Sequence, residues 1–146
     1  MGDDAWIDNM FSEMRSARKN TKDHSIYEEK RQAAIDAVVQ KYFRPGMPKE
    51  EAFVMLRQLQ AEGFWVTEYR HEGVRGWPDG ELQPYREDRK RNMQNQNPEG
   101  VSKFIARREQ PTLPVIFAEH IVVTFTVSDR DGSLTESGGS IGGTGL

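Results

Sequence analysis

Residues 42–69 constrain the fold more than any other part of the chain, because their sequence predicts a helix that is followed at once by a strand. Pro48 suits the first turn of a helix, and Gly63 suits the left-handed position that ends one. Between them the apolar residues recur at three- and four-residue spacing on one face: Ala52, Phe53, Leu56 and Leu59. Residues 64–69 are mostly aromatic or β-branched and predict a strand. With so short a connection, the helix must pack back on the sheet that this strand begins.

Two further helices are predicted before this stretch. Residues 4–19 carry an apolar stripe at helical spacing, with acidic residues at its start and basic residues at its end, which suits the helix dipole. Ser25 and Glu28 have the spacing of a capping box and begin a second helix. That helix ends before Pro45, because a residue that precedes proline is pushed out of the helical region.

The C-terminal part of the chain predicts strands. Residues 121–128 alternate between two faces, the clearest period-two pattern in the sequence, so one face belongs to the core and the other is half exposed. Residues 129–132, Asp-Arg-Asp-Gly, suit a tight turn, and residues 134–141 can return as the pairing strand. Residues 101–109 form another strand, which we expect residues 110–114 to interrupt with two prolines.

These elements predict one α+β domain in which two or three helices pack on one face of an antiparallel sheet of roughly four strands. The length of 146 residues suffices for a single core. The expected parts are N-terminal helices (1–43), a helix-to-strand unit (44–70), a long loop (71–100) and antiparallel strands (101–146). Since the chain has no cysteine, disulfides and thiolate zinc sites are excluded, and we expect neither a cofactor nor a metal.

The charge and the termini bear on the compartment and the partners. A net charge of −3 gives no global reason to bind nucleic acid or an anionic membrane. The acidic N-terminus lacks the order of a secretory signal, and no apolar run approaches the ~18 residues of a membrane span. We expect a soluble, cytoplasmic protein without a membrane partner.

Residues 71–100 are the first place to look for a binding surface. They are rich in glycine and proline, and loops beyond ~12–15 residues in a compact domain are usually functional or disordered. A short, exposed helix fits within residues 84–95. Tryptophan, tyrosine and arginine anchor protein interfaces, and acidic residues complement a basic cleft. The predicted contact residues are Tyr69, Arg70, Trp77, Asp79, Glu81, Tyr85 and Arg89.

Residues 44–52, Arg-Pro-Gly-Met-Pro-Lys-Glu-Glu-Ala, followed by Leu56, Leu59 and Gly63-Phe64, carry a Gly-Met-x-x-Glu-Glu-to-Gly pattern. This pattern resembles the small α/β domains shared by the outer-membrane assembly lipoprotein BamE (SmpA) and the beta-lactamase inhibitor protein. Residues 123–134 are similar to the sheet hairpin of that group. The chain departs from the pattern in lacking a lipobox cysteine and in its extra N-terminal helix and long loop. The resemblance implies a binding or inhibitory protein and not an enzyme.

The predicted function is therefore protein binding, by an immunity or inhibitor protein that occludes the active site of a bacterial toxin or enzyme. Two alternatives remain open. A small hydrolase or transferase would use Glu68, His71 and Glu72, although Arg75 stands where a zinc-protease helix needs its second histidine. Single-stranded nucleic acid would bind the basic residues between Arg86 and Arg91 by phosphate contact and stacking, although acidic residues dilute that patch.

Overall fold

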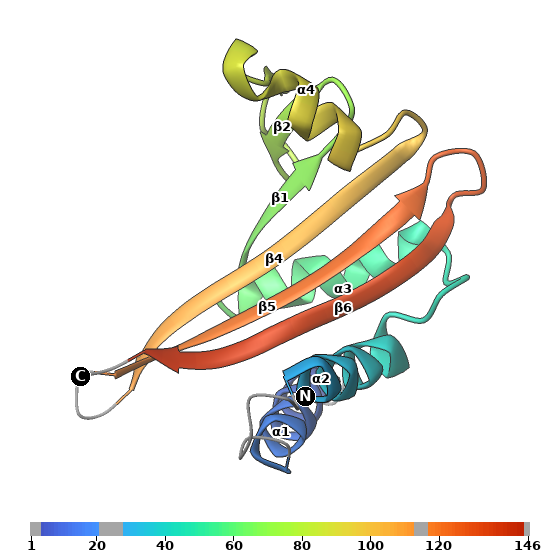
Figure 1. The fold of residues 1–146 in the computed structure, drawn as a ribbon. Helices are drawn as coiled ribbons and strands as arrows, with labels where there is room; N and C mark the ends of the chain where they lie inside the picture. The colour runs from blue at the N-terminus through green and yellow to red at the C-terminus, as the bar shows by residue number, and fades with distance from the viewer. Residues whose placement is uncertain (1–3, 21–27, 113–116, 145–146) are drawn as a thin grey trace.

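The computed structural model describes residues 4–20, 28–112 and 117–144. Within these ranges the chain forms four helices and one six-stranded antiparallel sheet (Figure 1). The helices are α1 (Ala5–Asn20), α2 (Glu28–Tyr42), α3 (Lys49–Ala61) and α4 (Glu87–Gln96). The strands are β1 (Trp65–Tyr69), β2 (Gly73–Gly76), β3 (Gln83–Pro84), β4 (Val101–Thr112), β5 (Phe117–Ser128) and β6 (Ser133–Thr144). The predicted α+β class is confirmed, with more helices and strands than expected.

The helix-to-strand unit forms as the sequence predicts. Pro48 is the extended residue before α3, and Gly63 has a φ of 93°, the left-handed conformation that ends a helix. The N–H of Lys49 donates to the carbonyl of Gly132 at 2.9 Å, which joins the start of α3 to the turn between β5 and β6. The unit is therefore fixed to the sheet at both of its ends, through this bond and through β1.

Strand order in the sheet is β3-β2-β1-β4-β5-β6. The alternation predicted for residues 121–128 is confirmed, because Ile121, Val123, Phe125 and Val127 are all buried on one face. The predicted interruption from residue 110 is wrong as far as Thr112, since β4 continues to pair with β5 there. Beyond Arg107 β4 has no partner on the β1 side. A proline such as Pro111 is tolerated along a free edge of this kind.

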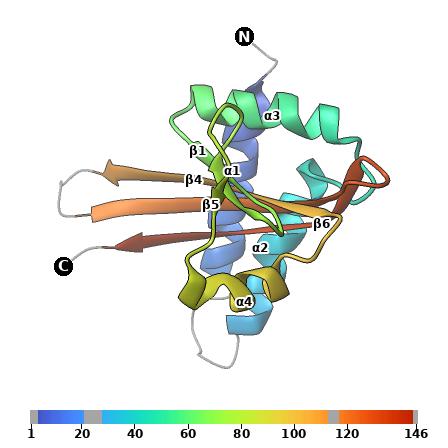
Figure 2. The ribbon, with the colours of Figure 1, turned by 90° about the horizontal axis from the view of Figure 1, so that it is seen from above.

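Helices α1, α2 and α3 and the covered face of the sheet share one hydrophobic core. Its centre is an aromatic stack, in which the ring of Phe125 lies 5.3 Å from that of Phe43 and 5.1 Å from that of Phe104. Figure 2 shows α3 on one side of the sheet and α4 on the other. None of the described helices is both long enough and apolar enough to cross a membrane.

Helix α2 covers the outer edge of β6 at Ser137 and Gly139. Gln32 donates from Nε2 to the carbonyl of Gly139 at 2.6 Å, and Asp36 accepts the N–H of Gly139 at 3.0 Å. One turn further on, Gln40 donates to the carbonyl of Ser137 at 3.2 Å. A Cβ on Gly139 would lie 2.9 Å from a methyl group of Val39 and 2.5 Å from the carbonyl oxygen of Val122. The glycine-rich segment therefore serves as an edge strand that a helix can approach closely.

The region predicted as a long loop, residues 71–100, is more regular than expected. It contains β2, β3 and α4, and α4 confirms the short helix predicted within residues 84–95. The two strands are too short for a periodic pattern to reveal them. The predicted capping residue Ser25 lies outside the described residues.

Candidate functional site

The best candidate site is the face of the sheet opposite α3, which we call the open face. Strand residues alternate between faces, so the neighbours of buried Val66 and Glu68 project here. The strand register aligns the side chains in rows. The first row is Trp65, Arg107, Val122 and Ser140, the second is Thr67, Ile105, Thr124 and Gly138, and the third is Tyr69, Lys103, Thr126 and Glu136.

Trp65 is the outstanding residue of the open face, because 58% of it is exposed. Its register partner Arg107 is also exposed and lies on the same face. In the second row, Thr67, Ile105 and Thr124 are half-buried, and Gly138 is buried beneath Asp36. The ring of Trp65 and the guanidinium of Arg107 are thus exposed next to a row of half-buried residues, where a partner can reach them.

A hollow of about 350 Å³ lies on the open face next to α2. Thr124, Thr126 and Glu136 line it from the sheet, and Asp36 and Gln40 line it from α2. A smaller hollow of about 180 Å³ separates α4 from the sheet. The open face is thus bounded by α2 on one side and by α4 on the other. Trp65 and Arg107 lie in its first row.

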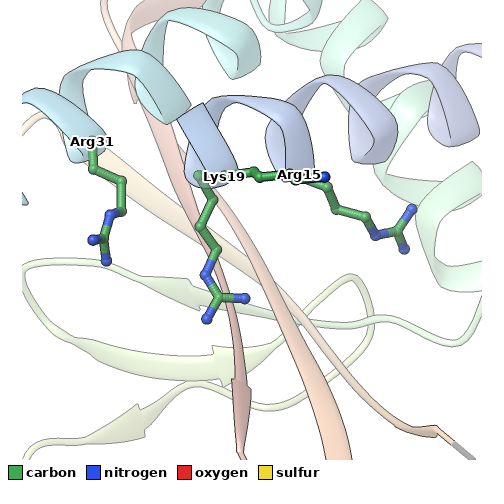
Figure 3. A pocket seen from close by; sticks show the side chains of 4 residues that line it. Arg15, Lys19 and Arg31 are labelled. Atoms are coloured by element: carbon green, nitrogen blue, oxygen red, sulfur yellow. The ribbon is translucent and has the colours of Figure 1, made fainter. Parts of the chain in front are cut away.

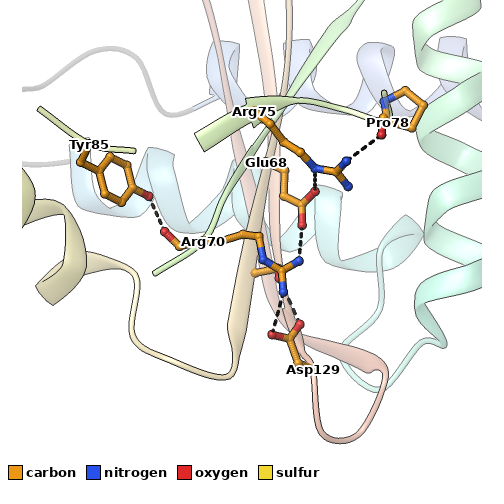
Figure 4. Close-up of polar contacts among 7 residues, drawn as sticks. Glu68, Arg70, Arg75, Pro78, Tyr85 and Asp129 are labelled. Atoms are coloured by element: carbon orange, nitrogen blue, oxygen red, sulfur yellow. Dashed lines mark hydrogen bonds and ion pairs between the residues drawn. The ribbon is translucent and has the colours of Figure 1, made fainter. Parts of the chain in front are cut away.

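A charged cluster lies on the covered side, where β1 and β2 meet the turn after β5 (Figure 4). Glu68 is only 2% exposed, and its two oxygens accept hydrogen bonds from Arg75 Nε at 2.7 Å and Arg70 at 2.9 Å. Arg70 also lies 3.6 Å from Asp129, which accepts a bond from Ser102 at 3.0 Å. Burial opposes the charge of Arg70, but the hydrogen bond and charge of Glu68 raise its pKa overall. The cluster compensates a buried carboxylate that would otherwise be costly.

The residues of the enzyme alternative, Glu68, His71 and Glu72, have different surroundings. Both oxygens of Glu68 are already bound by arginines. His71 Nδ1 lies 2.9 Å from the carbonyl oxygen of Asn97, and its Nε2 lies 3.8 Å from Glu99. Glu72 is exposed. In the described ranges, no three histidine, aspartate or glutamate side chains are placed to hold a metal ion.

The expectation that Trp77 contacts a partner conflicts with its position, because Trp77 is only 7% exposed. Its ring lies 5.3 Å from that of Phe53 and 6.4 Å from that of Phe104. The carbonyl of Trp77 accepts a bond from Gln60 of α3 at 3.0 Å. The segment after β2 folds back on α3, so most of Trp77 belongs to the core.

The other predicted contact residues lie in separate parts of the molecule. Tyr69 is on the open face, whereas Arg70 belongs to the charged cluster. Tyr85 is half-buried, and its hydroxyl donates to the carbonyl of Arg70; burial raises the pKa of this hydroxyl. The remaining three are exposed, in the turn after β2 and on α4: Asp79, Glu81 and Arg89. Trp65 is not among the predicted contact residues, although its alternation with buried Phe64 and Val66 places it on the opposite face.

Basic residues gather in two places. Those between Arg86 and Arg91 are exposed on or beside α4, where Arg86 pairs with Asp88 at 3.2 Å. A second group lines a hollow of about 470 Å³ between the end of α1 and the start of α2 (Figure 3). It consists of Arg15, Arg18, Lys19 and Arg31. Arg15 is bound by Glu119 at 2.7 Å, and this hydrogen bond lowers the pKa of Glu119.

Comparison of the chain with protein-family models, with curated proteins and with solved structures finds no match. The resemblance to the BamE and beta-lactamase inhibitor group therefore stays a prediction. The candidate site rests on the geometry of the open face alone.

Proposed function

We propose that this protein binds another protein through the open face, as an immunity or inhibitor protein that covers the active site of a bacterial toxin or enzyme. The observation that carries the proposal is the exposure of Trp65, which is 58% exposed beside Arg107 on a sheet face. Tryptophan and arginine are the residue types that contribute most to protein interfaces. A partner that covers them gains apolar burial and charge-assisted hydrogen bonds together.

The magnitude of the tryptophan contribution supports this function. A tryptophan buries roughly 150–250 Å² when it is fully covered, at about 25 cal/mol per Å². Covering the exposed half of Trp65 would therefore contribute about 2–3 kcal/mol of apolar transfer free energy, against which the entropic cost of association acts. Thr124 of the second row and Ser140 of the first row carry small side chains that are half-buried and exposed, respectively, and leave room for a partner's surface.

Rigidity of the platform favours an inhibitor. The open face is carried on long paired strands whose opposite side is packed with aromatic rings. A surface that is already ordered loses little conformational entropy when it binds, and this improves affinity. Exposed Asp79, Glu81 and Arg89 are available at the edges of the molecule to complement the charge of a catalytic cleft.

The test uses the product of the adjacent gene as the candidate partner, purified separately and titrated with this protein by calorimetry. Trp65→Ala and Arg107→Ala are each expected to weaken binding at least tenfold, or about 1.4 kcal/mol. Val54→Ala is the matched control, because Val54 is 57% exposed but lies on α3 at the other side of the sheet. It is expected to leave the dissociation constant unchanged.

Two results would distinguish the proposed binding surface from the proposed inhibition. Wild-type affinity in both Trp65→Ala and Arg107→Ala contradicts the open face as the binding surface. A partner that binds through Trp65 and Arg107 but keeps its full activity in the complex supports protein binding and contradicts inhibition.

A further inference from the structure

The charged cluster borders a small pocket that the proposed protein-binding function does not use. The pocket has a volume of about 140 Å³ and lies on the covered side of β1. Its polar lining comes from Lys49, Arg70, Arg75, Glu68, Asp129 and Ser102. Its apolar wall comes from the rings of Phe53, Trp77 and Phe104.

The charges that line the pocket do not balance. Three cations, Lys49, Arg70 and Arg75, face two carboxylates, Glu68 and Asp129. Both oxygens of Glu68 are occupied by the two arginines, and Asp129 is occupied by Ser102 and Arg70. One positive charge is thus left over within the lining. Exposed Glu72 acts on Arg70 from outside the pocket.

Lys49 is the source of the excess charge. It is half-buried at the first residue of α3, where its backbone N–H is bound to Gly132. In the described part of the chain its side-chain ammonium makes no hydrogen bond or ion pair. Lys49 lines the same pocket as Arg70 and Arg75, so an anion that enters the pocket can interact favourably with all three cations.

We propose that this pocket binds a small monocarboxylate with a short apolar body. The carboxylate of this ligand lies beside Lys49, Arg70 and Arg75. Its apolar body lies against the rings of Phe53 and Trp77. A single negative charge matches the single excess cation, whereas a doubly charged phosphate would leave a surplus of negative charge beside Glu68. The volume suits a ligand of roughly benzene size, since a cavity of about 150 Å³ holds benzene.

Two sources could supply this carboxylate: a free small acid, or the C-terminus of a peptide. The probes are sodium propionate, its neutral analogue propionamide, and a short peptide that ends in alanine with a free or an amidated carboxyl group. Binding is followed at the indole N–H signal of Trp77 in two-dimensional ¹H–¹⁵N NMR spectra, at constant ionic strength set with sodium chloride. The signal is assigned by its loss in Trp77→Phe.

Propionate is expected to shift the Trp77 signal saturably at about millimolar concentration, while propionamide does not. Lys49→Met is expected to weaken this binding at least tenfold, and Lys49→Arg, which keeps the charge, to bind within about threefold of wild type. Lys103→Met removes a lysine on the open face and is the matched control, with wild-type binding expected. Unchanged melting temperatures show that the variants fold.

The two sources give different results. Saturable binding of propionate assigns the pocket to a free acid, and binding of the free-carboxyl peptide alone assigns it to a peptide terminus. Equal shifts with propionate and propionamide overturn the proposal, as does wild-type affinity in a folded Lys49→Met, or the absence of binding by both propionate and the peptide. None of these results depends on Trp65 or Arg107, so the proposed protein-binding function is tested separately.

Discussion

The two faces of the sheet use the same strands for different purposes. On the covered face, Phe104, Val123 and Phe125 are almost entirely buried. On the open face, their immediate neighbours Lys103 and Thr124 are half exposed and polar. Because successive strand residues point to opposite sides, one segment can stabilise the fold with every second residue and leave the others free for recognition. Substitutions on the two faces are therefore expected to have separable effects.

The largest effect on stability is expected from Phe125→Ala. Phe125 stacks between Phe43 and Phe104, and its removal leaves a cavity at the centre of the core. The free energy of unfolding, measured by urea denaturation, is expected to fall by about 3–5 kcal/mol. The adjacent Thr124→Ala, on the open face, is expected to change it by less than about 1 kcal/mol. Equal losses in the two variants would show that the faces do not differ in this way.

Two tryptophans sharpen the same comparison. Trp77→Ala is expected to lower the free energy of unfolding by about 2–4 kcal/mol, because Trp77 packs on Phe53 and Phe104. Trp65→Ala is expected to lower it by less than about 1 kcal/mol, since most of Trp65 is already exposed to water. Denaturation curves of both variants measure the difference. A stability loss in Trp65→Ala as large as that in Trp77→Ala would make Trp65 a structural residue.

Gly139→Ala tests the contact between α2 and β6. The added methyl group would come within 2.5 Å of the carbonyl oxygen of Val122 and 2.9 Å of Val39, so the strand or the helix must move. The expected loss of unfolding free energy is about 1–3 kcal/mol. Gly142→Ala, three residues along the same strand with open space around its Cβ position, is the control and is expected to change stability by about 0.5 kcal/mol or less. Similar values for both would argue against close packing of α2.

The smallest effect concerns Glu119 and the pH dependence of stability. The hydrogen bond from Arg15 lowers the pKa of Glu119 below its ordinary value of 4.5 in the folded state. The stabilisation is therefore complete above that ordinary value and disappears as the pH falls through the folded pKa. Because Arg15 is half exposed, the expected contribution is about 0.2–1 kcal/mol.

Denaturation at pH 7 and pH 3 measures this contribution. The wild-type protein is expected to lose more stability between these pH values than Glu119→Gln, which has no charge to lose at that position. An identical loss in both would contradict the assigned ion pair.

The sequence predicted elements whose signals are local. Pro48 and Gly63 mark the ends of α3, and the alternation of residues 121–128 marks β5, because capping and period-two burial depend on nearby residues. The burial of Trp77 could not be predicted in this way. The sequence around it, Arg-Gly-Trp-Pro-Asp-Gly, has the composition of an exposed turn, and contacts with residues distant in sequence, such as Phe53 and Phe104, bury it.

The candidate site was predictable in part. The residue type of Tyr69 predicts a contact residue, and simple alternation along the strand places Trp65 on the same face as Tyr69. Arg107 joins Trp65 only through the pairing of β1 with β4, a register that one strand's sequence does not encode. The same long-range pairing brings Ser102 of β4 and Arg70 after β1 to Asp129, which closes the charged cluster.

The hydrogen bonds from α2 to Ser137 and Gly139 have a consequence for self-association. A bare outer strand is a template on which another copy can add its own strand and start a growing polymer. In β6, the side chains of Gln32, Asp36 and Gln40 already bind the backbone groups of Ser137 and Gly139 that another strand would use. At the opposite edge of the sheet, β3 has only two residues. The side chains of α2 therefore disfavour strand addition at residues 137–139 of β6, and the two residues of β3 offer little edge on the other side.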